Sequence, residues 1–148
     1  MLIEKLQEKL HTQIPLTKLM DIKIKDYNDV NLITTAPLEI NINDKGTAFG
    51  GSLSTMTIIS SWSLCWLITN ELGYENTNIV VIKNENSYKR PVTKDLECFT
   101  LKPTKEEIVL LKKKLDSKGS ASIKIKSYIK EEKEVCVEFE GYYVIKLI

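Results

Sequence analysis

Residues 46–70 read GTAFGGSLSTMTIISSWSLCWLITN and contain no charged side chain, although 28% of the 148-residue chain is charged. A helix of this composition has no charged face to turn toward water, so it must be covered on most of its sides. We therefore expect a buried helix from about Gly50 to Leu72, with Gly73 as its C-terminal cap. The rest of the chain must supply the cover.

The flanking segments show the periodicities of short helices and strands. Apolar residues recur at helical spacing near the N-terminus, and Pro15 is expected to end that helix; a second helix should begin at Thr104, which forms a capping box with Glu107. Alternating apolar runs predict strands over residues 22–24, 30–38, 79–88, 96–101, 123–129 and 135–143. The most economical cover for an uncharged helix is an antiparallel sheet curled around it. We therefore expect an α+β hotdog fold, in which an antiparallel sheet wraps around a long central helix, as one domain over residues 1–148.

Bulk composition excludes several classes of function. Twenty-one basic and twenty acidic residues leave a net charge of +1, which predicts no nucleic-acid partner. Serine and threonine interrupt the apolar segment, and the first ten residues lack the apolar core of a signal peptide, so neither a membrane span nor export is expected. Cys65, Cys98 and Cys136 are odd in number and lack metal-ligand spacing. Free thiols, a cytoplasmic location and the absence of a metal site are the corresponding predictions.

The start of the long helix is the candidate catalytic site. Gly50 and Gly51 would form its first turn, where backbone N–H groups and the positive end of the helix dipole can approach a ligand oxygen. Close packing of the helix against the sheet is the alternative reason for a glycine pair. Asn43 either donates its side-chain amide to a carbonyl oxygen or orients a water molecule, or it shapes its own loop, the role that we expect for Asn41.

Acid–base groups are harder to place than charge-stabilising ones. Glu85 could reach the helix of a neighbouring subunit, or it could be an exposed carboxylate on a strand. Lys89 and Arg90 either contact an anionic ligand or partner or are simply solvated. His11, the single histidine, is expected to have a surface or capping role. Ser60 and Ser61 are expected to bond the carbonyl of the preceding helical turn rather than act as nucleophiles.

Several motifs resemble those of the hotdog-fold, thioesterase-like family typified by the YiiD C-terminal domain. The resemblance spans most of the chain, and its carriers are Ile14-Pro15-Leu16 with Met20, Ala36-Pro37-Leu38 with Asn41 and Asn43, the run from Gly46 to Leu53, Trp62, and Tyr88-Lys89-Arg90-Pro91-Val92. The likeness implies a homodimer or a dimer of dimers with sites at the subunit interface. It also implies acyl thioesters of coenzyme A or acyl carrier protein as substrates, with no further cofactor. On this likeness Lys89 and Arg90 would bind the phosphate of a phosphopantetheine carrier or an acidic carrier protein, and Phe49, Ser52 and Tyr88 join them as the expected substrate-binding residues.

The resemblance also shows where this chain departs from related thioesterases. In the broader hotdog thioesterases the position before the glycine pair is often histidine, and a carboxylate on the central helix activates water or attacks the thioester. Here that position is Phe49, and residues 52–70 contain neither Asp nor Glu. Three functions therefore remain open. The leading one is an acyl-thioester hydrolase with an oxyanion site at the helix N-terminus. The others are a malonyl-carrier decarboxylase supplying acetyl carrier for fatty acid synthesis, and a non-catalytic binder of acyl carrier protein or acyl-CoA.

Overall fold

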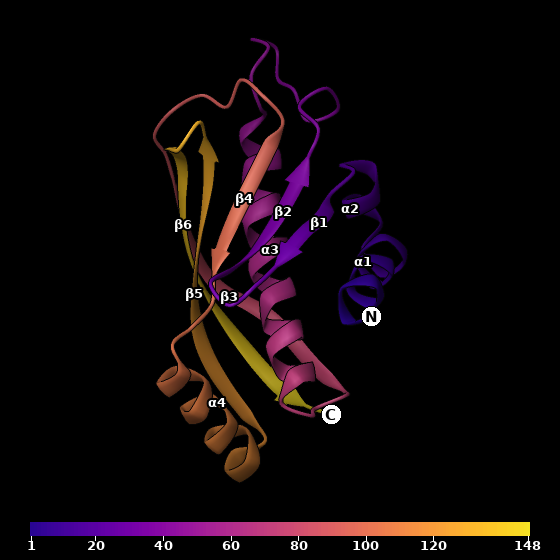
Figure 1. Cartoon of the computed structure of the whole chain (residues 1–148), viewed down its shortest axis with the longest axis vertical. Helices are drawn as coiled ribbons and strands as arrows, with labels where there is room; N and C mark the ends of the chain where they lie inside the picture. The colour runs from indigo at the N-terminus through magenta and orange to yellow at the C-terminus, as the bar shows by residue number, and fades with distance from the viewer.

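The computed structural model describes all 148 residues and contains four helices and six strands. The elements are α1 (Leu2–Gln13), α2 (Pro15–Leu19), β1 (Lys23–Tyr27), β2 (Asn31–Ala36), α3 (Gly50–Glu71), β3 (Thr77–Tyr88), β4 (Leu96–Leu101), α4 (Lys105–Lys118), β5 (Ser120–Glu131) and β6 (Glu134–Leu147). The strands form one antiparallel sheet in the order β1-β2-β4-β5-β6-β3, and α3 runs along one face of it (Figure 1). This is the predicted hotdog fold.

The N-terminal region contains one element that the sequence patterns did not predict. Pro15 does not simply end the first helix, because it also begins α2. Proline is well placed at the first position of a helix, where its missing N–H would have no intrahelical acceptor. Ile14 lies between the two helices with non-helical backbone angles, a φ of −126° and a ψ of 79°. The predicted N-terminal helix is confirmed as α1, and α2 adds a second, short helix beside the start of α3.

The predicted helix ends are confirmed in detail. Leu72 caps α3, and Gly73 follows with a φ of +94°, a conformation that favours glycine. Thr104 and Glu107 form both hydrogen bonds of the capping box that begins α4, which packs on β5 at the lower end of the molecule in Figure 1. The first two predicted strands are confirmed as β1 and β2, which pair as an antiparallel hairpin, and the last two are confirmed as the antiparallel pair β5 and β6.

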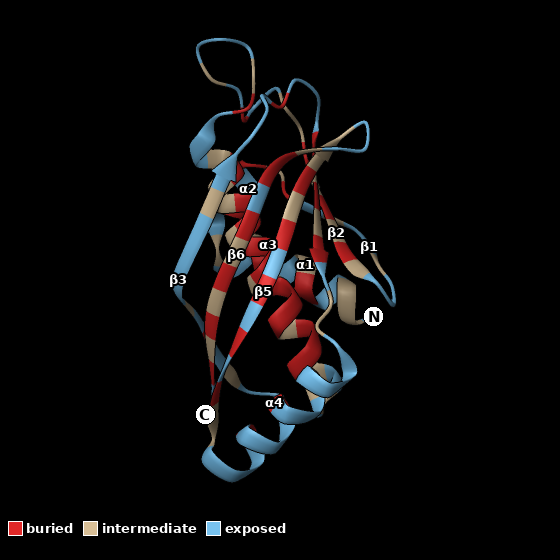
Figure 2. Ribbon diagram, turned by 90° about the vertical axis from the view of Figure 1, so that its left-hand side faces the viewer, coloured by how far each residue is buried: buried red, intermediate tan, exposed pale blue.

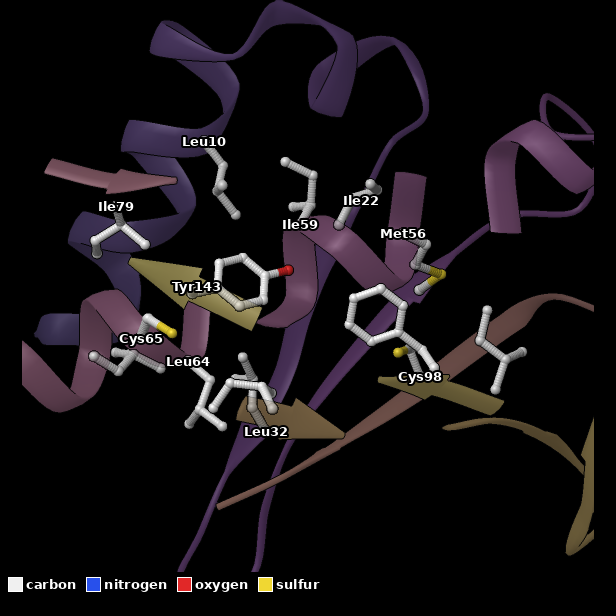
Figure 3. Close-up of a cluster of buried hydrophobic side chains, with 14 of the residues drawn as sticks. Leu10, Ile22, Leu32, Met56, Ile59, Leu64, Cys65, Ile79, Cys98 and Tyr143 are labelled. Atoms are coloured by element: carbon white, nitrogen blue, oxygen red, sulfur yellow. The ribbon is translucent and has the colours of Figure 1, made fainter. Parts of the chain in front are cut away.

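The core lies between α3, α1 and the concave face of the sheet. Alternate residues of β2, β5 and β6 are buried, as the bands in Figure 2 show. Tyr143 of β6 is fully buried among side chains of α1 and α3 (Figure 3), and its hydroxyl donates to the carbonyl oxygen of Ile58 at 2.7 Å. By length and composition α3 could cross a membrane, but most of it is buried as the core helix of this domain.

A chain of buried hydroxyl groups joins the middle of α3 to the sheet. Ser60 bonds Thr34 of β2 at 2.7 Å, and Ser61 bonds Ser127 of β5 at 2.8 Å. Ser127 also bonds Thr100 of β4 at 2.7 Å, and all five residues are fully buried. The expectation that the two helix serines bond the preceding turn was therefore wrong. The sheet lies close enough to offer them hydroxyl partners, which satisfy both groups at each contact.

The three cysteines are free and buried. Cys98 is fully buried within 4.0 Å of the Thr100 hydroxyl, and burial raises the pKa of its thiol to about 11 because the thiolate would lose its hydration. Burial raises the pKa of Cys65 and of Tyr143 as well. These groups are therefore held in their neutral forms, and none is activated as a nucleophile.

One side of α3 is not fully covered by the rest of the chain, although its apolar composition predicts burial there. Ile58, Trp62 and Trp66 recur at four-residue spacing and are only partly buried. Trp62 Nε1 donates to the Ile79 carbonyl oxygen at 2.9 Å, which fixes the indole against β3. β3 is an edge strand, paired only with β6, and it carries exposed Val80 and Ile82. The expectation that the charge-free helix is buried along nearly its whole length therefore holds for every side except this one.

Candidate active site at the start of the central helix

The loop before α3 is a compact turn organised by Asn43. The Asn43 N–H donates to the Thr47 carbonyl oxygen at 2.8 Å, and Ile42 and Ala48 form an isolated antiparallel bridge. Gly46 completes the turn with a φ of +82°, where a side chain would be strained. Ala48 N–H donates to the Val92 carbonyl oxygen at 2.9 Å, so the segment after β3 holds this loop in place.

Both polar atoms of the Asn43 side chain form hydrogen bonds within this loop. Its Oδ1 accepts from the N–H groups of Lys45 and Thr47 at 2.8 and 3.1 Å. Its Nδ2 donates to the Thr47 hydroxyl at 2.9 Å and lies 3.4 Å from the Ala48 carbonyl oxygen. Asn43 thus makes the hydrogen bonds expected of a loop-shaping residue. Donation to a substrate oxygen would require it to exchange one of these bonds.

Asn41 is the more buried of the two asparagines, with an exposed fraction of 2%. Its Nδ2 donates to the backbone carbonyl oxygens of Met20 and Pro37 at 3.0 and 2.8 Å. Its backbone carbonyl oxygen accepts from the Phe49 N–H at 2.7 Å. Asn41 therefore joins the end of α2 to the start of α3. Its side-chain oxygen, however, has no hydrogen-bond partner. The sequence had suggested only the loop-shaping part of this role.

The first turn of α3 carries free hydrogen-bond donors. Phe49 is the N-cap residue, and no side chain accepts a hydrogen bond from the helix there. The first N–H groups of an α-helix lack intrahelical acceptors, and here they belong to Gly50, Gly51 and Ser52. They coincide with the positive end of the dipole of a 22-residue helix. The turn can therefore stabilise negative charge on a ligand oxygen.

The two glycines differ in what the fold requires of them. A Cβ at Gly51 would lie 2.4 Å from Cε2 of the Phe49 ring, so this glycine lets the ring lie across the helix start. A Cβ at Gly50 would meet no atom within 4 Å, and its φ is ordinary for any residue. Packing thus explains Gly51 but not Gly50. The space beside Gly50 is open in the chain itself.

A cavity of about 390 Å³ opens beside this turn, between α2 and the loop before α3. It brings together three of the predicted residues, Phe49, Gly51 and Ser52. No Asp, Glu or His lines it. Glu71, the first carboxylate on α3, lies at the far end of the helix and accepts a hydrogen bond from the Tyr27 hydroxyl at 2.5 Å. The site can therefore stabilise charge, but it offers no carboxylate or imidazole base.

Other predicted residues lie outside this cavity. Asn86 of β3 accepts a hydrogen bond from the Thr57 hydroxyl on α3 at 3.2 Å, so its neighbour Glu85 faces the opposite side of the sheet. Glu85 lines a separate surface hollow with Glu138 and Glu140 of β6. The structure does not bring Glu85 together with the first turn of α3 in one protomer.

Tyr88, Lys89 and Arg90 lie at the end of β3 that leads to the loop contact at Val92. Tyr88 is exposed, and no hydrogen bond orients its hydroxyl. Lys89 Nζ lies 3.6 Å from Glu138, and Arg90 Nη1 lies 2.7 Å from Glu134, with all four side chains well exposed. Exposed pairs of this kind are weak enough to be exchanged for an anionic ligand. His11 Nε2 lies 2.8 Å from the Ile22 carbonyl oxygen, which leaves it in a structural role between α1 and β1.

Comparison with known proteins identifies the family of this chain. The model of the YiiD_C family, described as "Putative thioesterase (yiiD_Cterm)", matches residues 3–147. The chain belongs to this family. The expected membership is thereby confirmed over almost the full length of the chain, including the loop before α3 and the strand that ends at Tyr88.

Solved structures similar to this YiiD_C domain share its whole fold. A protein of unknown function from Chlorobaculum tepidum TLS is 32% identical, with a TM-score of 0.92 over 98% of this chain and 94% of that one. A protein from Shewanella oneidensis, described as a putative thioesterase, is 28% identical, with a TM-score of 0.87 over 97% and 96%. A Pseudomonas aeruginosa protein, described as a "probable thioesterase", is 17% identical, with a TM-score of 0.73 over 97% and 94%. At that identity the last likeness shows the fold alone.

Proposed function

We propose that this protein hydrolyses acyl thioesters of coenzyme A or acyl carrier protein, with the thioester oxygen bound at the first turn of α3. The observation that carries the proposal is the uncapped first turn of α3, whose residues Gly51 and Ser52 line a cavity, with Gly50 next to them in the same turn. Membership of a thioesterase family supports the substrate class. Uncapped N–H groups do not stabilise the free chain. A ligand oxygen placed there would accept their hydrogen bonds and would be stabilised by the positive end of the helix dipole.

The proposed chemistry relies on charge stabilisation. Attack of water on a thioester places negative charge on the carbonyl oxygen, and donors fixed in advance at that point stabilise the transition state more than the substrate. Removal of one such donor typically costs about 10²- to 10³-fold in kcat. Asn43 acts here by holding the loop that ends at Phe49, which fixes the direction of the donors.

Decarboxylation of a malonyl thioester is the second candidate. It is favoured by one observation, the absence of Asp, Glu and His from the cavity wall, since hydrolysis needs an activated water molecule. Loss of carbon dioxide instead leaves an enolate, whose oxygen N–H donors can stabilise until its carbon takes a proton from water and the acetyl thioester forms. The same groove in a non-catalytic protein would bind acyl carriers without turning them over.

We further propose a homodimer in the cytoplasm, formed through β3 and the uncovered side of α3. The edge of β3 is unpaired, and Ile58, Trp62 and Trp66 continue its apolar surface. A second copy would pair the strand edges and bury the indole rings, as a symmetric interface allows. Sedimentation equilibrium at twice the chain mass of 16.9 kDa is the expected result, and a monomer would contradict it.

Product analysis by mass spectrometry tests the proposed function. The purified protein is incubated separately with acyl and malonyl thioesters of coenzyme A and of acyl carrier protein. Hydrolysis releases free thiol and a carboxylic acid, and this is the expected result. Conversion of the malonyl thioester to the acetyl thioester would establish decarboxylation instead. Binding of the carriers without any product would leave only the non-catalytic function.

A further inference from the structure

The cavity beside α3 has an apolar wall supplied largely by α2. Leu16 and Leu19 of α2 line it and are 50% and 74% exposed. Ile40 and Phe49, from the loop before α3, line it too and are 54% and 55% exposed. Large apolar side chains gathered around one hollow and turned to solvent indicate a place where an apolar ligand or partner binds. The wall is therefore chemically distinct from the polar first turn of α3.

A second observation concerns the charge that this cavity accepts. Asn41 lines the same cavity, and the carbonyl oxygens of Met20 and Pro37 accept from its Nδ2, so its orientation is fixed. The remaining atom, Oδ1, is buried and unpaired, which is unfavourable in the free chain. An unpaired carbonyl oxygen attracts a hydrogen-bond donor and repels a carboxylate. No Lys, Arg or His lines the cavity, so an acidic chain would find no partner there.

We propose that this cavity is the acyl-chain subsite, that it takes an uncharged chain, and that Leu16 and Leu19 determine the chain length. This inference rests on the proposed function, in which the thioester oxygen binds at the first turn of α3. Gly51 belongs both to that turn and to the cavity wall, so the two are continuous. A thioester whose oxygen meets the first-turn N–H groups would therefore direct its chain along this wall. The subsite then distinguishes substrates by how much apolar surface they bury between α2 and Phe49.

Chain-length profiles of a filled cavity test the subsite. The values of kcat/KM are measured for straight-chain acyl-CoAs from acetyl to dodecanoyl in the wild type and in Leu16→Trp. The larger side chain is expected to lower the dodecanoyl-to-acetyl ratio by about tenfold or more. Val109→Trp, at an exposed position on α4 outside the cavity, is the matched control and should leave the ratio unchanged. An unchanged ratio in Leu16→Trp would overturn the inference.

Binding measurements separate failure of the subsite from failure of the proposed function. If the wild type releases no product from any acyl thioester, hydrolysis is refuted, and calorimetric titration with the same acyl-CoAs still tests the cavity. Affinity should then rise with chain length in the wild type and rise less in Leu16→Trp. Malonyl-CoA should bind about tenfold more weakly than butyryl-CoA, whose chain is similar in size. Equal affinity for these two would refute the preference for an uncharged chain.

Discussion

Gly50→Ala is expected to lower kcat/KM for acyl thioesters by about 10²-fold while leaving the fold intact. The added Cβ meets no atom of the chain within 4 Å, and the φ of Gly50 suits alanine. Alanine is also the better helix former, so the free energy of unfolding should be unchanged or raised by up to about 1 kcal/mol. A methyl group next to the first-turn N–H groups would instead hinder the approach of a thioester oxygen to this turn.

The two readouts on this variant separate the functional from the packing explanation of the glycine pair. Thermal unfolding measures the packing effect, and steady-state kinetics measures the effect on the ligand. Gly51→Ala provides the comparison, because its Cβ must displace the exposed Phe49 ring, and some of its loss of activity would come from that movement. Full activity in Gly50→Ala would show that no substrate atom approaches this turn.

Ser127→Ala is expected to destabilise the fold by about 2–3 kcal/mol, although it changes only one buried hydroxyl group. Ser127 bonds Ser61 of α3 and Thr100 of β4, and each would lose a partner in a place that water does not reach. For a chain of this length the melting temperature should fall by about 5–10 °C. Urea or thermal unfolding followed by circular dichroism measures the change.

One control variant and one double variant test the cause of this loss of stability. Ser122→Ala lies on the same strand but faces solvent, and its effect should stay within about 0.5 kcal/mol. Ser61→Ala combined with Ser127→Ala should cost less than the sum of the single changes, because one replacement has already removed the bond that they share. An effect of Ser127→Ala as small as that of Ser122→Ala would show that the hydroxyl chain contributes nothing to stability.

Most of the fold follows from periodicity and from signals at the ends of elements. The charge-free segment predicts α3 because burial on most sides is the only favourable state for such a helix. Thr104 with Glu107, and Gly73, mark helix ends through local hydrogen bonds and local backbone angles, so neighbouring residues alone reveal them. α2 was not predicted, because Pro15 was interpreted only as the end of the first helix. Proline also suits the first position of a helix, and here it begins α2.

The candidate site was predictable only in part. The glycine pair at a helix start predicts free N–H groups, since that property depends on backbone position alone. The different tasks of Gly50 and Gly51 depend on where the Phe49 ring lies, which local sequence does not determine. The unpaired oxygen of Asn41 depends on the approach of Met20 and Pro37. The hydroxyl partners of Ser60 and Ser61 likewise come from strands far away in the chain.

A crystal structure of this protein with a non-hydrolysable ketone analogue of an acyl-CoA, in which a methylene group replaces the thioester sulfur, is the sharpest test of the proposed site. We expect the ketone oxygen to lie at about 2.7–3.1 Å from first-turn N atoms of α3, among Gly50, Gly51 and Ser52. We also expect the acyl chain to lie against Leu16 and Phe49. A ketone oxygen bound away from this turn, with the N–H groups still free, would contradict the proposed site.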